Sequence, residues 1–376
     1  MQRWVSESNL YIGLMSGTSL DGVDGVMVDL GTSTRVLGHC SAAFSDALKI
    51  EFLALNAATS NELHRAALAG NTLMQVYAQV VQQLLKRTGM RASEVRAIGA
   101  HGQTVRHRPA EFDGVGYTIQ INQPALLAEL CGIDVVADFR SRDVAAGGQG
   151  APLVPPFHRA FFGKDGTPRA VLNIGGISNV TVLNADAGAN LIGFDCGPGN
   201  ALMDGWCFAH IGAAFDDAGA WAASGEINSA LLETLLSEPF FQKPPPKSTG
   251  RDLFNATWLA QHLHATPSIK PVDVQATLAE LTALSCAGSI TTAVADCTSL
   301  VVCGGGAHNK HLMARLQNAL PRTRVESSDS LGLPPMQVEA TAFAWLAQQA
   351  VMRVPASIKS VTGARGARIL GAIYAA

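Results

Sequence analysis

The sequence contains few charged and few aromatic residues, which make up 15 % and 6 % of its 376 positions. With a formal net charge of −3, it gives no electrostatic reason to expect nucleic acid or an anionic membrane as a partner. No apolar run reaches the roughly 18 residues that a membrane-spanning helix needs. The first residues, MQRWVSESNLYIG, also lack the apolar stretch of a signal peptide. We therefore expect a cytoplasmic protein.

Cysteine is scarce as well, and its spacing excludes two kinds of site. The seven cysteines are odd in number, scattered, and never in a C-x-x-C spacing. This pattern indicates free thiols in a reducing compartment and argues against a zinc site. Hydrophobic residues make up 48 % of the chain, which is typical of a globular protein. Its length suits two domains of ordinary size.

Strand and helix patterns alternate along the chain, which predicts an α/β architecture. The break at FQKPPPKSTGRDLF is expected to be an ordered loop inside a domain, because periodic pattern resumes directly after it. Apolar spacings of three and four predict helices over 62–87, 123–131, 226–237, 272–295 and 337–351. Short β-rich runs predict strands over 95–100, 116–121, 133–138, 170–176, 179–183, 191–195 and 299–306.

A strand, a glycine-rich turn and a second strand occur twice, in YIGLMSGTSLDGVDGVMVDL and in AVLNIGGISNVTVL. In the first turn, Gly17 and Gly22 allow a close approach of the backbone to a ligand, and Ser16, Thr18 and Ser19 add hydroxyl donors. Asp21 and Asp24 suit a phosphate site only if a divalent cation lies between carboxylate and phosphate. The alternative is a hairpin turn in which these residues serve turn geometry alone.

Two later segments have the same character. In GFDCGPGNALMDGW, Asp195 ends a strand, and a helix starts near Asn200 with N–H groups that favour anions. The alternative, in which Asp195 merely caps the helix, is weaker because Gly199 and Asn200 are better placed to do so. VVCGGGAHN ends another strand in Gly304–Gly306, which suits the close passage of a nucleoside or an ordinary loop equally.

These elements together resemble the actin-like ATPase superfamily, which includes sugar kinases and chaperone ATPases. The resemblance extends to one family. MSGTSLDGVD, AHGQTVRHRP, ADFRSRDVAAGGQGAPLVP, NIGGISN, FDCGPGNALMD, VCGGGAHN, VEATAFAWLA and SVTGARGARILGAIY occur in this order, over residues 10 to 374. They are similar to the motifs of anhydro-N-acetylmuramic acid kinases, which act in peptidoglycan recycling.

The resemblance implies a duplicated ribonuclease H-like α/β fold with two domains and a central cleft. It implies a sugar- and phosphate-binding domain at 1–165 plus about 345–376, a nucleotide-binding domain at 166–344, and a homodimer. It also implies a reaction in which water opens the 1,6-anhydro bridge at C1 while O6 takes the γ-phosphoryl group of ATP. The general base of the family matches Asp195, and a carboxylate suits that role. Mg²⁺ is expected at Asp21.

The turns and the resemblance together give a set of expected ligand residues. The ATP-binding residues are Gly17, Thr18, Ser19, Leu20, Asp21, Gly22, Val23, Asp24, Gly175, Gly176, Ser178, Asn179, Gly197, Gly199, Asn200, Gly304, Gly305 and Gly306. The sugar-binding residues that the resemblance implies are His101, Gln103, Arg106, Asp138, Arg140 and Glu339.

Three alternatives stay open for the sugar-binding stretches. Residues 101–108 also suit a solvated polar loop, Arg142 also suits an internal pair with an aspartate, and Glu339 also suits a helix N-terminus. The sequence departs from the family at Cys196, where a threonine is usual, so a hydroxyl contact is in doubt.

Two other functions compete with the one that the resemblance implies: a plain sugar kinase without the hydrolytic half, and a nucleotide-dependent switch. The wide loop at 138–153 argues against the first, and the lack of length for a further domain argues against the second.

Overall fold

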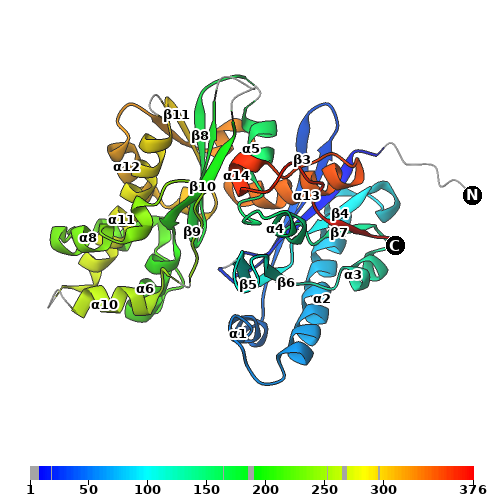
Figure 1. Cartoon of the computed structure of the whole chain (residues 1–376), viewed down its shortest axis with the longest axis horizontal. Helices are drawn as coiled ribbons and strands as arrows, with labels where there is room; N and C mark the ends of the chain where they lie inside the picture. Colours follow the sequence, from blue (N-terminus) through cyan, green and yellow to red (C-terminus); the bar gives the residue numbers. More distant parts are fainter. Residues whose placement is uncertain are drawn as a thin grey trace, which may run out of the picture. The chain divides into compact units, whose positions relative to one another are not determined.

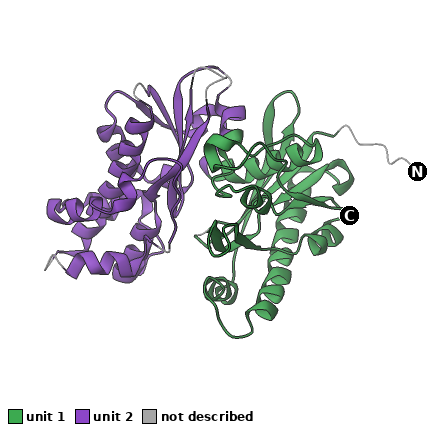
Figure 2. Ribbon diagram, viewed as in Figure 1, with its two compact units in different colours: residues 1–157, 336–376 green, residues 158–335 purple. Residues whose placement is uncertain are grey.

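The computed structural model describes residues 8–17, 19–163, 165–184, 190–251, 253–264, 269–294 and 297–376. The chain forms two compact units (Figure 2). Unit 1 comprises Met1–Phe157 and Met336–Ala376, and unit 2 comprises His158–Pro335. Residues 158–165 and 336–344 thus belong to the opposite unit from the one expected for them.

Unit 1 is built on a six-stranded sheet of order β13-β7-β4-β1-β2-β3. Three of these strands, β3, β4 and β7, are labelled in Figure 1. β1, β2 and β3 form an antiparallel meander, β4 and β7 run parallel to β1, and β13 pairs antiparallel at the edge. The strands are β1 Leu10–Met15, β2 Gly22–Leu30, β3 Thr34–Ala43, β4 Ala97–Ala100, β7 Val135–Ala137 and β13 Ala372–Tyr374.

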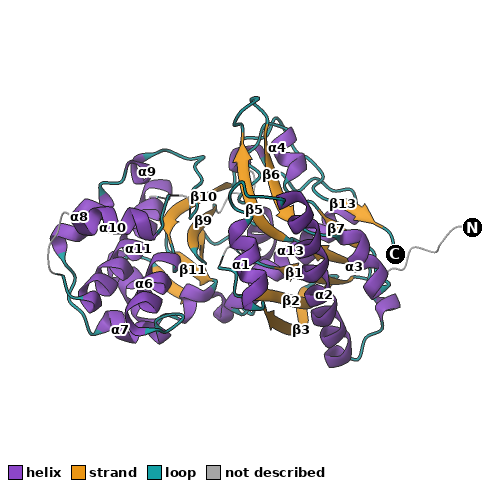
Figure 3. Ribbon diagram, turned by 90° about the horizontal axis from the view of Figure 1, so that it is seen from below, coloured by secondary structure: helices purple, strands orange, loops and turns teal. Residues whose placement is uncertain are grey.

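Helices cover both faces of this sheet (Figure 3). Strand side chains alternate between the faces, so Ile12 packs with the cluster of α2 while Tyr11 packs with that of α13. The helical segments are α1 Asp46–Ala54, α2 Glu62–Thr88, η1 Ala92–Glu94, α3 Pro124–Cys131, α4 Ser141–Ala145, α5 Pro155–Phe162, which continues into unit 2, α13 Val338–Val351 and α14 Lys359–Thr362. A separate hairpin pairs β5 Gln103–Pro109 with β6 Gly116–Ile121.

Two glycines let α13 lie directly on the strands. A Cβ at Gly13 would come within 1.8 Å of the Ala340 carbonyl oxygen, and one at Gly99 within 2.1 Å of the Phe343 carbonyl oxygen. No side chain larger than hydrogen fits at either point. Helix α13 is therefore an integral layer of unit 1.

Unit 2 repeats the strand order of unit 1. Its five-stranded sheet has the order β10-β9-β8-β11-β12, with an antiparallel meander of β8, β9 and β10 and with β11 and β12 parallel to β8. The order β3-β2-β1-β4-β7 of unit 1 is the same arrangement, so the predicted duplication is confirmed. The strands are β8 Arg169–Ile174, β9 Ile177–Leu183, β10 Ile192–Pro198, β11 Ser299–Cys303 and β12 Arg324–Ser327.

The long helix α11 is the centre of the core of unit 2. It contributes Leu278, Leu281 and Ile290 to a cluster with strand residues such as Leu172 and Phe194. The helical segments are α6 Ala201–Ile211, η2 Asp217–Gly219, α7 Ala220–Ala223, α8 Ser229–Leu236, α9 Pro239–Gln242, α10 Ala256–His264, α11 Pro271–Ala293, η3 Gly305–His308, α12 Lys310–Ala319, η4 Ser328–Leu331 and η5 Pro335–Gln337, which continues into unit 1. Within the described residues, no helix is long and apolar enough to cross a membrane.

Candidate active site

The carboxyl ends of three parallel strands meet at one edge of unit 1. β1 ends at Met15, β4 at Ala100 and β7 at Ala137. The first glycine turn, residues 101–103 and residues 138–140 follow these ends directly. In open α/β sheets this edge is where ligands bind. Chain positions that lie far apart in the sequence therefore meet at the edge where a ligand is expected.

Helix α13 begins at the same edge. Its Ala340 lies against Gly13 near the end of β1, whereas Gln348 donates to the Leu30 carbonyl (3.0 Å) at the opposite edge. Glu339, half-buried in the first turn of α13, is consequently placed with the other expected sugar residues of unit 1.

The first glycine turn presents short polar side chains to solvent. The Leu20 N–H donates to the Gly17 carbonyl (3.2 Å), and Leu20 takes a positive φ of 61° with its side chain buried. Ser19 and Asp21 are exposed, and Thr18 lies outside the described residues. Because the turn is compact and its carboxylate and hydroxyl are accessible, it can approach an anion together with a cation.

The end of this motif belongs to strand β2. A Cβ at Gly22 would lie 2.2 Å from the Ala42 carbonyl oxygen of β3, so this glycine permits close strand pairing. Val23 is buried, which leaves only its backbone for a ligand. The Asp24 carboxylate pairs with His39 Nε2 at 3.2 Å. Direct contacts of these three residues with nucleotide stay predictions.

The hydroxyl of Ser16 corrects one expectation. Ser16 is 1 % exposed and donates to the Gly102 carbonyl (2.9 Å), while its oxygen lies 2.9 Å from the Tyr77 hydroxyl. The Gly102 N–H donates to that same Tyr77 oxygen (3.1 Å). The three groups form a closed ring in which each donates once and accepts once. Ser16 is therefore part of the scaffold and is not a donor for phosphate.

His101 and Arg140 form a second polar contact at this edge. The Arg140 guanidinium lies 2.9 Å and 3.1 Å from His101 Nε2 through two of its nitrogens, and it donates to the Gly150 carbonyl (2.8 Å). Gln103 Nε2 donates to the Gly17 carbonyl (3.2 Å), which ties residues 101–103 to the first turn. The expected sugar and phosphate stretches of unit 1 are thus neighbours.

His101 is neutral because of its surroundings. Burial, and next the positive charge of Arg140, lower the pKa of His101 to about 3. Its ring centroid lies 4.7 Å from that of Phe343 on α13. Since His101 Nε2 accepts from Arg140 in this state, the imidazole orients the guanidinium rather than adding a second positive charge.

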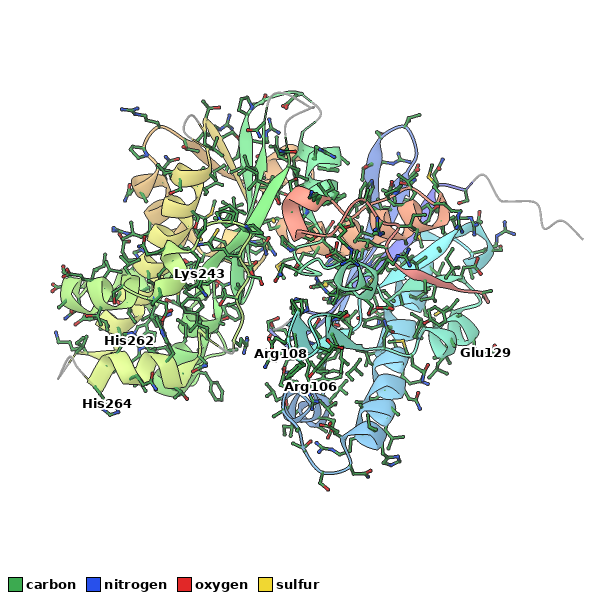
Figure 4. All side chains as sticks on the ribbon, in the orientation of Figure 1. Arg106, Arg108, Glu129, Lys243, His262 and His264 are labelled. Atoms are coloured by element: carbon green, nitrogen blue, oxygen red, sulfur yellow. The ribbon has the colours of Figure 1, made fainter. Side chains whose placement is uncertain are left out.

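Asp138 and Arg106 differ in how they are engaged. Asp138 is exposed directly after β7 and takes a positive φ of 58°, a strained backbone for a residue other than glycine. Arg106 forms an ion pair with Glu62 and donates to the carbonyls of Leu55 (3.2 Å) and Ala57 (2.7 Å), beside α1 (Figure 4). Arg106 therefore has a structural role, and its contact with sugar stays a prediction. Residues 103–109 form β5 and not the polar loop of the alternative.

In unit 2 three strand ends also meet at one edge. β8 ends at Ile174, β11 at Cys303 and β10 at Pro198. β11 is parallel to β8, and β10 runs in the direction of β8 because each is antiparallel to β9. The second glycine turn, the segment after Asp195 and the third glycine loop lie together there.

The second turn occupies three of the N–H groups at the start of α6, which were expected to be open to an anion. The Gly175 carbonyl accepts from the Asn200 N–H (2.8 Å), and the Gly176 carbonyl accepts from Gly199 (3.0 Å) and Ala201 (3.2 Å). A Cβ at Gly199 would lie 2.2 Å from the Gly175 oxygen. These three N–H groups therefore hold the turn against the helix, and they are not available to an anion.

The residues after this turn behave differently from one another. Ser178 is fully buried and its hydroxyl donates to the Pro198 carbonyl (3.3 Å). Asn179 lies directly opposite Asp195 in the β9–β10 pair. Its buried Oδ1 has no hydrogen-bond partner among the described residues, and such an atom favours a donor supplied by a ligand or by water.

The third glycine loop lies on the end of β8. A Cβ at Gly304, whose φ is 77°, would lie 2.7 Å from the Ile174 carbonyl oxygen, and one at Gly306 would lie 2.4 Å from Ile174 Cγ2. A Cβ at Gly305 would lie 3.4 Å from the Asn200 amide nitrogen. Glycine is thus needed for close packing, and the loop borders the second turn.

Asp195 is held by a loop that no local sequence pattern links to it. Its N–H donates to the Lys247 carbonyl (3.1 Å), and its Oδ2 accepts from the Thr249 N–H (2.9 Å). After it, a bulge with Gly197 at a φ of 145° passes the Phe241 ring, where a Cβ would clash at 2.6 Å. The proline-rich run marks a loop, but nothing local in the sequence says what that loop touches.

Cys196 faces the core. It is fully buried, and burial raises the pKa of its thiol well above its ordinary value. Cys286 of α11 lies beside it. The departure from threonine therefore affects the packing under Asp195 and supplies no contact for a phosphate.

The donor set at Asp21 fits one kind of metal ion. Among the described residues, no group of three or more His, Cys, Asp or Glu side chains could hold a metal by itself. Mg²⁺ is commonly bound by one or two carboxylates together with phosphate oxygens and water. An exposed carboxylate in a glycine turn suits that mode.

Two units of equal strand order, each with glycine turns at the carboxyl edge of its sheet, define a duplicated ribonuclease H-like fold of the kind that actin-like ATPases and sugar kinases share. Within this class the chain belongs to the anhydro-N-acetylmuramic acid kinase family, whose model matches residues 9–376.

Relatives of nearly equal length agree with this assignment. Anhydro-N-acetylmuramic acid kinase from Albidiferax ferrireducens is 60 % identical over 388 aligned positions, which cover 98 % of this chain and all of the relative. The alignment with the enzyme of the same name from Variovorax paradoxus is 60 % identical and covers 98 % of this chain and 99 % of that enzyme.

A solved structure, Acidaminococcus fermentans (R)-2-hydroxyglutaryl-CoA dehydratase component A, aligns with a TM-score of 0.49 at 14 % identity over 90 % of this chain and 96 % of its own.

Proposed function

We propose that this protein is an ATP-dependent kinase that opens the 1,6-anhydro bridge of anhydro-N-acetylmuramic acid and phosphorylates O6. The products are N-acetylmuramic acid 6-phosphate and ADP, in the recycling of peptidoglycan. Family membership over residues 9–376 supports the substrate. The observation that carries the mechanism is the Asp195 carboxylate, held by the Thr249 N–H at the ligand edge of unit 2.

In this mechanism Asp195 is the general base. It takes a proton from a water molecule, whose oxygen forms a bond to C1 while the C1–O6 bond breaks. O6 then bonds to the γ-phosphorus, and ADP leaves. Asn179, opposite Asp195 and with an unpartnered Oδ1, is placed to accept a hydrogen bond from the same water or from the sugar.

Phosphoryl transfer depends on positioning and on neutralising charge. We assign the phosphates to the turns at 16–24 and 175–179, and adenosine to Gly304–Gly306. Mg²⁺ at Asp21 would neutralise phosphate charge. His101, Gln103, Asp138, Arg140 and Glu339 are assigned to the sugar, and the Arg140 guanidinium suits its carboxylate.

The proposal includes unit 1 as the sugar- and phosphate-binding domain, unit 2 as the nucleotide-binding domain, a cytoplasmic location and a homodimer. Seven free cysteines support the reducing compartment. Light scattering of the purified protein tests the dimer.

Isotope labelling tests the reaction. In ¹⁸O-labelled water the label should enter the C1 hydroxyl only, measured before the hemiacetal exchanges with solvent. A plain sugar kinase acting on opened sugar would place no label at C1 or in phosphate, and an ATPase would place it in free phosphate.

The Asp195→Asn variant tests the base. We expect turnover to fall by about 10²-fold or more, with unchanged melting temperature and ATP affinity. A near-normal rate in a folded variant would remove Asp195 from the mechanism.

A further inference from the structure

The loop of residues 243–251 closes the outer edge of β10. Among the residues that the structure describes, β10 is the last strand of its sheet, and one side of its backbone has no partner strand. The loop supplies partners there through the Lys247 carbonyl and the Thr249 N–H, which contact the backbone and the carboxylate of Asp195 respectively. The direction of the carboxylate therefore depends on where this loop lies.

The side chain of Lys247 fixes the loop to its surroundings. Its Nζ donates to the carbonyls of Phe240 and Phe241, both at 3.3 Å, at the end of α9. The same nitrogen lies 4.7 Å from the ring centroid of Phe240 and 5.8 Å from that of Phe194, the residue before Asp195. Cation–π contacts of this length are attractive, and more so when partly shielded from water.

Lys247 is also a cation near the expected base. Burial lowers the pKa of Lys247, while the neighbouring Cys196 and Asp195 raise it and Lys243 lowers it. Asp195 and Lys247 therefore interact as opposite charges, and an adjacent cation favours the ionised form of a carboxylate. The nearby Cys196, and Cys286 next to it, are buried thiols.

We propose that Lys247 is a positioning residue for Asp195. It acts in two ways: it holds the loop so that the Thr249 N–H aligns the carboxylate, and its charge keeps that carboxylate ready to accept a proton from water. This inference rests on the proposed role of Asp195 as the general base, and nothing in it requires Lys247 to touch the substrate.

The test is the pH dependence of kcat/KM for the anhydro sugar in Lys247→Met, which keeps the aliphatic stem and removes the charge. We expect kcat to fall about tenfold or more because the base is misaligned. We also expect the acid limb of the profile to move to higher pH by about 0.5–1 unit. The dissociation constant of ATP should stay unchanged.

Lys243→Met is the matched control, because Lys243 is exposed at the start of the same loop (Figure 4). It should keep the wild-type kcat and acid limb. Lys247→Arg should keep the wild-type acid limb, which also tests the charge if the methionine variant fails to fold.

An unchanged acid limb in Lys247→Met, an equal shift in Lys243→Met, or a shifted limb in Lys247→Arg would overturn the proposal. The proposed function fails by a different result, namely normal turnover in Asp195→Asn.

Discussion

The Tyr77 hydroxyl joins the first glycine turn to the segment after β4. With Ser16 and Gly102 it completes a buried ring of hydrogen bonds, and burial raises the pKa of Tyr77 far above its ordinary value. Tyr77 lies in the middle of α2, so this helix and not only the turn determines where the expected ligand residues stand.

Replacing Tyr77 by phenylalanine should destabilise the protein by about 1–3 kcal/mol, because the Gly102 N–H loses its buried acceptor. KM for ATP should rise as the turn loosens. Denaturant unfolding and steady-state kinetics measure both effects. Tyr374→Phe, on the edge strand β13, is the control and should change neither; equal effects in both variants would contradict the role of the ring.

His158 predicts a pH dependence of stability. It is fully buried with Nδ1 2.8 Å from Thr181 Oγ1, and burial lowers its pKa to about 3, from an ordinary value of 6.5. Below about pH 6.5 the unfolded chain binds a proton that the folded chain does not. Stability is therefore lost as the pH falls from about 6.5 toward 3.

His158→Gln removes the imidazole that binds this proton in the unfolded chain. Between about pH 6 and pH 4 the free energy of unfolding of wild type should fall more steeply than that of the variant, by about 1.4 kcal/mol per pH unit. Denaturant titrations at several pH values measure the two slopes. The exposed His264 (Figure 4) gives the control His264→Gln, which should follow wild type. Parallel curves for wild type and His158→Gln would contradict the prediction.

Residue roles were predictable from the sequence only where a local pattern carried them. The helix start near Glu339 follows from periodicity and is confirmed, since α13 begins at Val338. Asp195, expected at the end of its strand, lies inside β10 instead, because the strand continues to Pro198. The burial of the Ser16 hydroxyl against Tyr77 and the contact of Thr249 with Asp195 were not predictable, because each depends on a partner far away in the chain. The sequence shows that a hydroxyl or amide side chain is present, but it does not show whether that side chain contacts a ligand or another part of the protein.

Helix α13 packs so closely on the sheet of unit 1 that only glycine fits beneath it at two positions. Its backbone lies on Gly13 and Gly99, and its first turn carries Glu339. A methyl group added at Gly13 would require α13 to move, since the obstacle is backbone and not a flexible side chain.

Gly13→Ala should therefore lower the free energy of unfolding by about 3 kcal/mol or more, above the usual range for overpacking. It should also raise KM for the sugar through displacement of Glu339. Gly205→Ala is the control: a Cβ in that helix meets nothing within 4 Å, so alanine should be neutral or stabilise by about 0.5–1 kcal/mol. Wild-type stability of Gly13→Ala would contradict the close contact.

The five predicted helices correspond to α2, α3, α8, α11 and α13. α2 has one apolar face, whereas α11 and α13 are buried on most sides, so their apolar content as well as its spacing indicated a helix. The strand β5 at 103–109 was less predictable, since its polar residues pair with β6 in a hairpin with little burial. Short helices such as α4 and α14 gave no periodic signal, because they contain only one turn.

For the whole molecule, the two units differ in how the chain supplies them. Unit 2 is continuous, and its core cluster lies wholly within residues 158–335. Unit 1 draws its second core layer, with Phe343 and Leu346, from the segment after unit 2.

A fragment of residues 158–335 should therefore unfold cooperatively by itself, whereas residues 1–157 alone should not. The shorter fragment exposes the sheet face that α13 covers, so it should bind a hydrophobic dye and be cut readily by protease. Adding residues 336–376 as a separate peptide should restore resistance. A stable, protease-resistant 1–157 fragment would contradict this division.

The glycine-lined contact between α13 and the first strands has a consequence for synthesis. A ribosome delivers β1 and β4 early, yet the layer that shields one face of them leaves the exit tunnel only after all of unit 2. Domains generally fold as units during translation. The unit that is begun first is thus finished last, and the nascent chain must carry an open sheet face through the synthesis of residues 158–335.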